Sequence, residues 1–274
     1  MAADPHLVLT AGAEAPVPGL ARQGPPRWLG AVVPVGLVAA LELAARLGWV
    51  PPNLLPPPSE VLQTLWSLAG QGLAGHVAAS SLRVLAGFAA GGAAALAVGA
   101  VVGLSRRMEM LLDPTFQALR AIPSLAWVPL LLLWLGIDES PKLVLIAIGA
   151  FFPVYMGVAS GFRDVDRKLV EVARMAGLSP LALVRRVLLP AALPAVLTGL
   201  RNGLSLAWMF MVAAELIAAT QGLGYLLTDG RETSRADIVL AAIVLLALLG
   251  KFTDTLMQRL EHRLLAWRDT FDTR

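Results

Sequence analysis

Several ionisable side chains lie within or beside long apolar stretches of this sequence, and they are its clearest candidates for chemistry. They include Arg120, Arg201 and Glu215, with Glu42 and Lys251 as further cases. A charge at the centre of a bilayer costs at least a few kcal/mol, so each group should face a partner or a water-filled path. The long aliphatic side chain of Arg120 could instead let its guanidinium reach the lipid headgroups. For Glu215 we expect a structural or gating role, with a basic partner from another helix.

Enzymatic and metal-binding chemistry find little support in the sequence. There is no cysteine, which removes disulfides and thiolate sites, and the three histidines lie far apart. The pair Gly250-Lys251 does not end a phosphate-binding loop, because Leu245 stands where the first glycine belongs and Phe252 follows the lysine. We therefore expect no catalytic residue, no metal site and no cofactor in this chain.

The overall composition indicates a membrane protein. Hydrophobic residues make up 57% of the chain and charged residues 15%, with a mean hydropathy of +0.71. Soluble domains are about 45–50% apolar and about 25% charged. The net charge of +3 is too small to indicate nucleic acid as a partner.

Six stretches are long and apolar enough to cross a bilayer, for which a helix needs roughly 20 residues. The clearest runs from Val84 to Ser105 without a charge. Asp138 to Lys142 is expected to form a polar turn between the third and fourth spans. The sequence thus predicts an all-α, polytopic membrane protein with spans at 28–50, 84–105, 121–137, 143–162, 195–219 and 238–257.

Small residues and prolines give further information on the spans. In the second span, a small residue recurs at every fourth position, at Gly87, Gly91, Ala95, Gly99 and Gly103. Such a ladder lets a neighbouring helix approach closely. We expect that neighbour to belong to the same chain, with a dimer seam as the alternative. Prolines inside the spans, at 123, 129 and 153, are expected to kink them.

The basic residues predict the orientation of the chain. If the N-terminus lies inside, 14 basic residues fall in cytoplasmic segments and 3 in external loops. This orientation agrees with the rule that short cytoplasmic loops carry an excess of Lys and Arg. Both termini are then cytoplasmic, with tails at 1–27, expected to be disordered, and 268–274. An amphipathic helix at 59–69, with Ser59 as N-cap and Glu60 in its first turn, should lie at the outer interface.

The loop after the fourth span has the pattern of two short helices joined at a glycine. Apolar residues recur at helical spacing from Lys168 to Ala176, and Gly177 can adopt the left-handed conformation that ends a helix. Ser179 and Pro180 suit the N-cap and first position of a second helix. We expect a helix–glycine–helix elbow within 163–190, which either binds a partner or only links two spans.

The elbow resembles the signature loop of ABC importer permeases. It reads Glu171-Val172-Ala173, then Gly177, then Val187-Leu188-Leu189-Pro190 at the family's spacing. Val172 replaces the usual second alanine, and Val187 stands where isoleucine is commoner. The segments LRAIPSLAWVPLLLLWLGI, GAFFPVYMGVASGFRDVD and AELIAATQGLGYLL also look like the permeases of aliphatic sulfonates, with taurine and nitrate importers as relatives.

The resemblance implies a type I permease fold over 28–267 in the inner (plasma) membrane. It also implies two ATP-binding subunits that hold ATP and Mg, a second permease copy forming a homodimer, a periplasmic or lipid-anchored binding protein, and contact with membrane lipid. The residues it places at the ATPase are Glu171, Val172, Ala173, Gly177, Ser179, Pro180, Leu189 and Pro190.

For a sulfonate cargo moved by alternating access, the candidates to line the path are Arg120, Arg201 and Glu215. A cationic side chain suits an anion, whereas an unpaired Glu215 in the path would repel it. The alternative is a secondary transporter driven by an ion gradient, in which Glu42 and Glu215 would be the coupling carboxylates. Such a transporter would not need the elbow.

Overall fold

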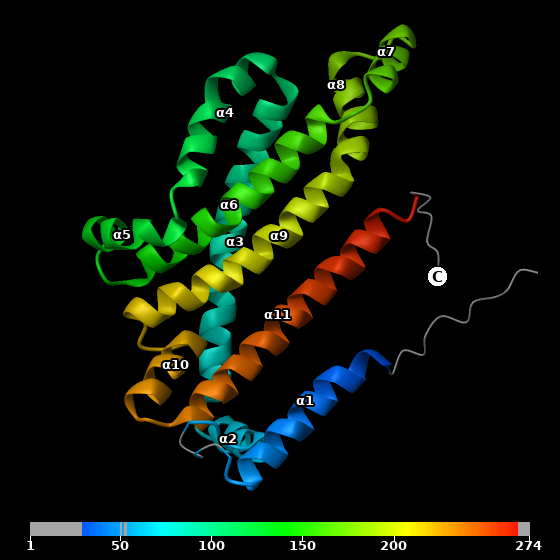
Figure 1. Ribbon diagram of the computed structural model, residues 1–274. Coiled ribbons are helices and arrows are strands. Elements are labelled where there is room, and N and C mark those ends of the chain that lie inside the picture. The colour runs from blue at the N-terminus through cyan, green and yellow to red at the C-terminus, as the bar shows by residue number, and fades with distance from the viewer. Residues whose placement is uncertain (1–28, 50, 52–53, 268–274) are drawn as a thin grey trace, which may run out of the picture.

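The computed structural model describes residues 29–49, 51 and 54–267, and every regular element within them is helical (Figure 1). The tails predicted at 1–27 and 268–274 lie outside the described residues. Five helices are long and apolar enough to cross a membrane, and a sixth crossing would need the bent pair α4 and α5. The predicted all-α, polytopic class is confirmed.

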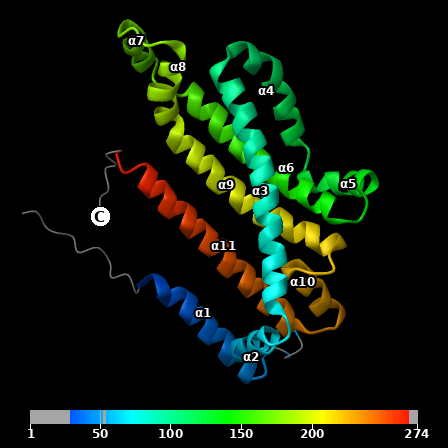
Figure 2. The ribbon, with the colours of Figure 1, turned by 180° about the vertical axis from the view of Figure 1, so that it is seen from behind.

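The elements in chain order are α1 (Leu29–Arg46), α2 (Pro58–Ala69), α3 (Leu73–Leu104), α4 (Arg106–Ala121), the 3-10 turn η1 (Ser124–Trp127), α5 (Val128–Leu135), α6 (Glu139–Arg163), α7 (Arg167–Met175), α8 (Pro180–Leu183), the π turn η2 (Val184–Leu188), α9 (Leu189–Ala218), α10 (Leu223–Glu232) and α11 (Ala236–Leu264). Helix α6 packs between α3 and α9. In Figures 1 and 2, α4 and α5 lie on one side of α6 and α9, and α11 and α1 on the other.

The small-residue ladder of α3 faces α6 of the same chain. A Cβ atom added at Gly87, Gly99 or Gly103 would lie under 3.0 Å from side chains of α6, those of Ile146, Val158 and Phe162. The two backbones can approach closely only because these positions lack a side chain. The prediction that the ladder packs within one chain is confirmed.

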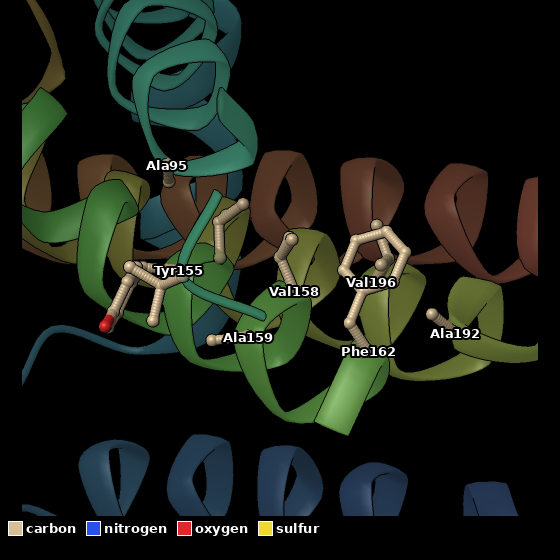
Figure 3. Packing of buried hydrophobic residues seen from close by; sticks show 9 residues of the cluster. Ala95, Tyr155, Val158, Ala159, Phe162, Ala192 and Val196 are labelled. Carbon is tan, nitrogen blue, oxygen red and sulfur yellow. The ribbon is translucent and has the colours of Figure 1, made fainter. Parts of the chain in front are cut away.

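A buried apolar cluster continues this contact across α3, α6 and α9 (Figure 3). Ala95, Val158 and Val196 come one from each helix, and all three are under 9% exposed. Tyr155 lies at one end of the cluster, with its hydroxyl pointing away from Val158 and Val196 in Figure 3. That hydroxyl donates to Asp113 of α4 at 2.8 Å, so α4 is joined to the core by a polar contact.

The third predicted span, 121–137, is wrong as a single helix. Helix α4 already begins at Arg106, and it meets the η1–α5 segment at an angle of 87°. The break falls at Ile122 and Pro123, both with extended ψ values near 120°. A residue before proline is pushed out of the helical region, so an apolar stretch with Pro123 near its start bends there.

The polar turn predicted at 138–142 is also misplaced. Helix α6 begins at Glu139, so Glu139 and Lys142 lie in its first turn. The turn itself is shorter and passes through Gly136, whose φ is +79°. Lys142, expected in an external loop, is only 5% exposed, and its ammonium group donates to Glu139 at 2.8 Å.

Helices α1 and α2 lie at the periphery. The amphipathic helix predicted at 59–69 is confirmed as α2, but Ser59 is not its N-cap. Instead, Glu42 of α1 accepts from the Ser59 N–H at 3.0 Å and from its hydroxyl at 2.9 Å. Thr64 of α2 donates to Asp237 of α11 at 2.7 Å. No residue of α1 is buried, so its apolar side chains are available to lipid.

Candidate functional site

The predicted elbow projects at one end of the bundle, where α7 and α8 extend beyond the other helices (Figure 1). Asp166 caps α7 by accepting from the Lys168 N–H at 2.9 Å. Gly177 has a φ of +74°, and its N–H donates to Arg174 O, while that of Leu178 donates to Ala173 O. These two bonds form a Schellman motif, the helix ending that glycine favours. The predicted left-handed role of Gly177 is confirmed.

The second arm of the elbow begins as its sequence predicts. The Ser179 hydroxyl accepts from the Ala182 N–H at 3.4 Å, and Pro180 is the first residue of α8. Helix α8 then runs through the π turn into α9, so that one helix extends from Pro180 to Ile217. In the π turn, the Leu189 N–H donates to Val184 O, five residues back. The wider turn accommodates Pro190, which lacks an N–H and would clash in a regular helix.

The elbow exposes apolar side chains at its tip. Val172 is 65% exposed, Met175 88% and Leu181 77%. Ala173, by contrast, is buried, and Glu171 pairs with Arg167 along the same helix at 3.0 Å. Leu189 and Pro190 lie in α9, well away from the tip. Exposed apolar surface of this kind marks a site of contact with another protein or with membrane.

Glu215 is buried, and it belongs to a charge cluster at the opposite end of the bundle from the elbow. Its carboxylate accepts from Arg83 Nη1 at 2.7 Å, from the Ser80 hydroxyl at 2.8 Å and from the Gly224 N–H at 2.8 Å. Arg83 also forms a bidentate pair with Glu139, at 2.6 and 2.8 Å. We call Ser80, Arg83, Glu139, Lys142 and Glu215 the Glu215 cluster.

The expectation that Glu215 has a basic partner from another helix is confirmed, and that partner is Arg83 of α3. Sequence reasoning did not identify Arg83, because the predicted second span began just after it, at Val84. Helix α3 in fact extends eleven residues further back, to Leu73, which puts Arg83 within the helix and 8% exposed. The available signal was an arginine directly before the uncharged stretch that begins at Val84, which is weak.

Arg201 has a partner on a different side of the bundle. Its guanidinium donates to Asp254 of α11 at 2.6 and 3.0 Å, and Glu261 lies 3.8 Å away. The pair joins α9 to α11 and is about one-third exposed at Arg201. Arg201, Glu215 and Arg120 are therefore not brought together in one site, and the lining role predicted for Arg201 stays a prediction.

Arg120 lies in the last turn of α4, next to the break, rather than at the start of a span. It contacts the thioether sulfur of Met156 on α6. Both residues line a cavity of about 160 Å³ between α4 and α6, together with Gln117, Tyr155 and others. Arg120 thus faces another helix of the bundle, away from the end where headgroup contact was considered.

Comparison with known proteins identifies the family. The sequence model of the binding-protein-dependent transport system inner membrane component matches residues 76–266. The chain belongs to this family. It is a multi-pass inner-membrane permease of the ABC importer type.

This permease has relatives of considerable similarity. It is 45% identical to the putative aliphatic sulfonates transport permease protein SsuC of Escherichia coli (strain K12), over 87% of this chain and 91% of the relative. It is 38% identical to the taurine transport system permease protein TauC of the same strain, over 81% and 83%. The nitrate import permease protein NrtB of Leptolyngbya laminosa is 32% identical, over 88% and 93%.

A solved structure has the same fold. The MetNI methionine ABC transporter, in inward-facing conformations, aligns with a TM-score of 0.58 over 74% of this chain and 98% of the solved chain. At 22% sequence identity, the likeness concerns the fold of the permease. The predicted ABC importer permease fold is confirmed.

Proposed function

We propose that this permease carries aliphatic sulfonates across the inner membrane as the spanning subunit of an ATP-driven importer. The 45% identity to a protein named as an aliphatic sulfonates permease supports the cargo. The observation that carries the ATP-driven part is the elbow, a rigid projection with exposed Val172, Met175 and Leu181 at its tip. An apolar tip on a projecting helix pair is suited to a groove in another protein.

In this proposal, two ATP-binding subunits dock on the elbows of two permease copies, bind ATP and Mg, and carry out the hydrolysis. A periplasmic or lipid-anchored binding protein delivers the sulfonate on the other side. The 14 to 3 distribution of basic residues supports an orientation with the elbow and both termini in the cytoplasm. The elbow's own basic residues, Arg167, Lys168 and Arg174, would then lie beside the ATPase.

Coupling needs an element that is stiff enough to transmit movement between the two ends. The continuous helix from Pro180 to Ile217 has 38 residues, or roughly 57 Å. One end is the second arm of the elbow, and Glu215 near the other end holds the Glu215 cluster. Movement of the elbow by the ATPase would therefore be passed to the far end of the bundle, as alternating access requires.

The elbow can be tested with a pair of glycine variants. Gly177→Val places a β-branched residue at a φ of +74°, while Gly48→Val does the same at a φ of +71° at the end of α1 remote from the elbow. Both positions are open, so both changes add similar backbone strain. In proteoliposomes with the matching ATPase and binding protein, Gly177→Val should reduce ATPase association and uptake at least about tenfold.

Gly48→Val should keep both activities. Normal ATPase association and uptake in Gly177→Val would refute the coupling role of the elbow. Uptake by the unmodified complex that followed an ion gradient and ignored ATP would refute the ATP-driven importer itself. No observation favours the secondary transporter, since Glu42 bonds to Ser59 of α2 and Glu215 is held by Arg83.

A further inference from the structure

Arg120 differs from the other basic side chains inside or at the edges of the predicted spans. Five basic residues lie inside or at the edges of the predicted spans, namely Arg46, Arg83, Arg120, Arg201 and Lys251. Within the described part of the chain, four of them have a carboxylate oxygen within 4.0 Å, and Arg120 does not. Its one polar contact is the sulfur of Met156, a weak acceptor. Arg120 is thus a cation whose guanidinium is available to an anion.

Arg120 is exposed in the single chain, but it lies well along α4 from the helix start at Arg106. It is 14 residues beyond the start of α4 at Arg106, roughly 21 Å along the helix. Its contact Met156 is seven residues before the end of α6 at Arg163, roughly 10 Å. Because a lone cation at such a depth is costly in lipid, such residues mark ion or substrate pathways.

The cavity that Arg120 lines adjoins a larger apolar one. The polar cavity measures about 160 Å³ and the apolar one about 370 Å³, and Phe152 is a wall of both. The apolar cavity lies between Ala90 and Ala94 of α3 and the rings of Trp127 and Phe151. Its volume falls in the range of small-molecule sites, which are mostly apolar with a few placed polar groups.

Asp113, the acidic side chain in the polar cavity, does not oppose an anion strongly. Its carboxylate accepts from the Tyr155 hydroxyl at 2.8 Å and from Gln117 at 2.7 Å. Arg163 lies 3.8 Å away and also pairs with Glu109 at 2.9 Å. Donors on α4 and α6 therefore already compensate the charge of Asp113, whereas Arg120 forms no ion pair within 4.0 Å among the described residues.

We propose that these two adjoining cavities form one substrate site inside the permease, which holds an alkanesulfonate in transit. The sulfonate oxygens bind the guanidinium of Arg120, whose planar fork suits an oxyanion. The alkyl chain lies in the apolar cavity, against Trp127 and Phe151. The site rests on the proposed function, because it takes its ligand from the cargo proposed there, and it adds where that cargo binds and which residue recognises its charge.

Direct labelling tests the site. The probe is an alkanesulfonate with a diazirine on its alkyl chain, applied to the full transporter in phosphatidylcholine nanodiscs without the binding protein. Irradiation should label the α6 segment that contains Phe151 and Phe152, and octane-1-sulfonate should compete. Arg120→Gln should reduce this labelling at least about tenfold, and Arg120→Lys should retain part of it. Lys251→Gln, which removes a basic residue remote from both cavities, should leave it unchanged.

A second variant keeps Arg120 and fills the apolar cavity. Ala94→Trp should abolish the gain in apparent affinity that longer alkyl chains give. In the unmodified complex, each added methylene should improve apparent affinity up to roughly threefold to fourfold until the cavity is full. An unchanged chain-length profile in Ala94→Trp would count against the site even if Arg120→Gln failed to fold.

The remaining outcomes separate the possible occupants. Labelling of α6 that survives Arg120→Gln, or that octan-1-ol displaces as well as octane-1-sulfonate, would overturn the site. Loss of labelling in phosphatidylglycerol nanodiscs would assign Arg120 to a lipid phosphate instead. If the unmodified complex imports no alkanesulfonate with ATP, the proposed function fails. If it imports them and labelling is independent of Arg120, only the site fails.

Discussion

Glu215 and Arg83 are 132 residues apart in the sequence and form a buried ion pair of 2.7 Å that joins α9 to α3. The same guanidinium binds Glu139 at the start of α6 and the carbonyl of Gln221 at 2.6 Å. One side chain therefore holds three core helices and the loop before α10 together. It does so at the end of the bundle remote from the elbow.

Loss of Arg83 should destabilise the permease strongly. Removing one partner of a buried pair leaves a charge without compensation, which costs about 3–5 kcal/mol. Arg83→Gln should therefore lower the midpoint of thermal unfolding in detergent far more than Arg46→Gln. Arg46 also pairs with a glutamate, at 2.6 Å, but is 69% exposed, where such pairs contribute about 1 kcal/mol or less. Equal shifts in the two variants would contradict the structural role of the cluster.

Two adjacent glycines of α3 should respond oppositely to alanine. A Cβ atom at Gly91 would lie 2.8 Å from the Cα atom of Ala147 on α6, whereas one at Gly92 would meet nothing within 4 Å. Gly91→Ala should cost about 1–3 kcal/mol through overpacking. Gly92→Ala should be neutral or stabilising by up to about 1 kcal/mol, because alanine favours the helix. Unfolding midpoints of the two variants, compared side by side, decide the point.

The pair between Arg201 and Asp254 offers a test of whether Arg201 lines the path. If its role is to join α9 to α11, Arg201→Gln and Asp254→Asn should each lower stability, with a coupling of about 1 kcal/mol between them. The swapped variant Arg201→Asp with Asp254→Arg should then recover much of both stability and uptake. Recovery of stability without uptake would instead favour a direct role in the path.

Glu42 should matter to α2 rather than to ion coupling. It accepts two hydrogen bonds from Ser59 at the first turn of that helix. Glu42→Ala should lower the local stability by about 1 kcal/mol, which hydrogen exchange of the first-turn amides of α2 would report. Glu60→Gln, a charge change in the same turn, is the matched control. Uptake by Glu42→Ala should stay driven by ATP, and a loss of uptake with intact α2 amides would refute this assignment.

The local patterns of the sequence were sufficient to predict several features. Gly177, Ser179 and Pro180 predict the elbow because a left-handed residue, a cap and a fixed φ are properties of single positions and their near neighbours. The glycine ladder of α3 likewise predicts close packing, because the absence of side chains at regularly spaced positions is visible in the sequence. Pro123 predicted a kink, although the sequence did not show that the chain would turn by 87° there.

The partners of the charged residues could not be predicted in this way. Arg83 and Glu215, or Arg201 and Asp254, meet only because α3, α9 and α11 pack at particular depths and rotations. A sequence shows that a charge in an apolar stretch needs compensation, but many residues can supply it at similar cost.

By itself, the sequence determined that the chain lies in a membrane, where most of its spans run, and that an elbow projects from them. These three features depend on hydropathy and on short-range backbone preferences, which are set by residues close together in the chain. Only the tertiary structure decided that Glu215 is neutralised by Arg83, that Glu42 caps α2, and that Arg120 lines a cavity without forming an ion pair of its own among the described residues. Those outcomes depend on contacts between helices distant in the chain, and packing alone selects them.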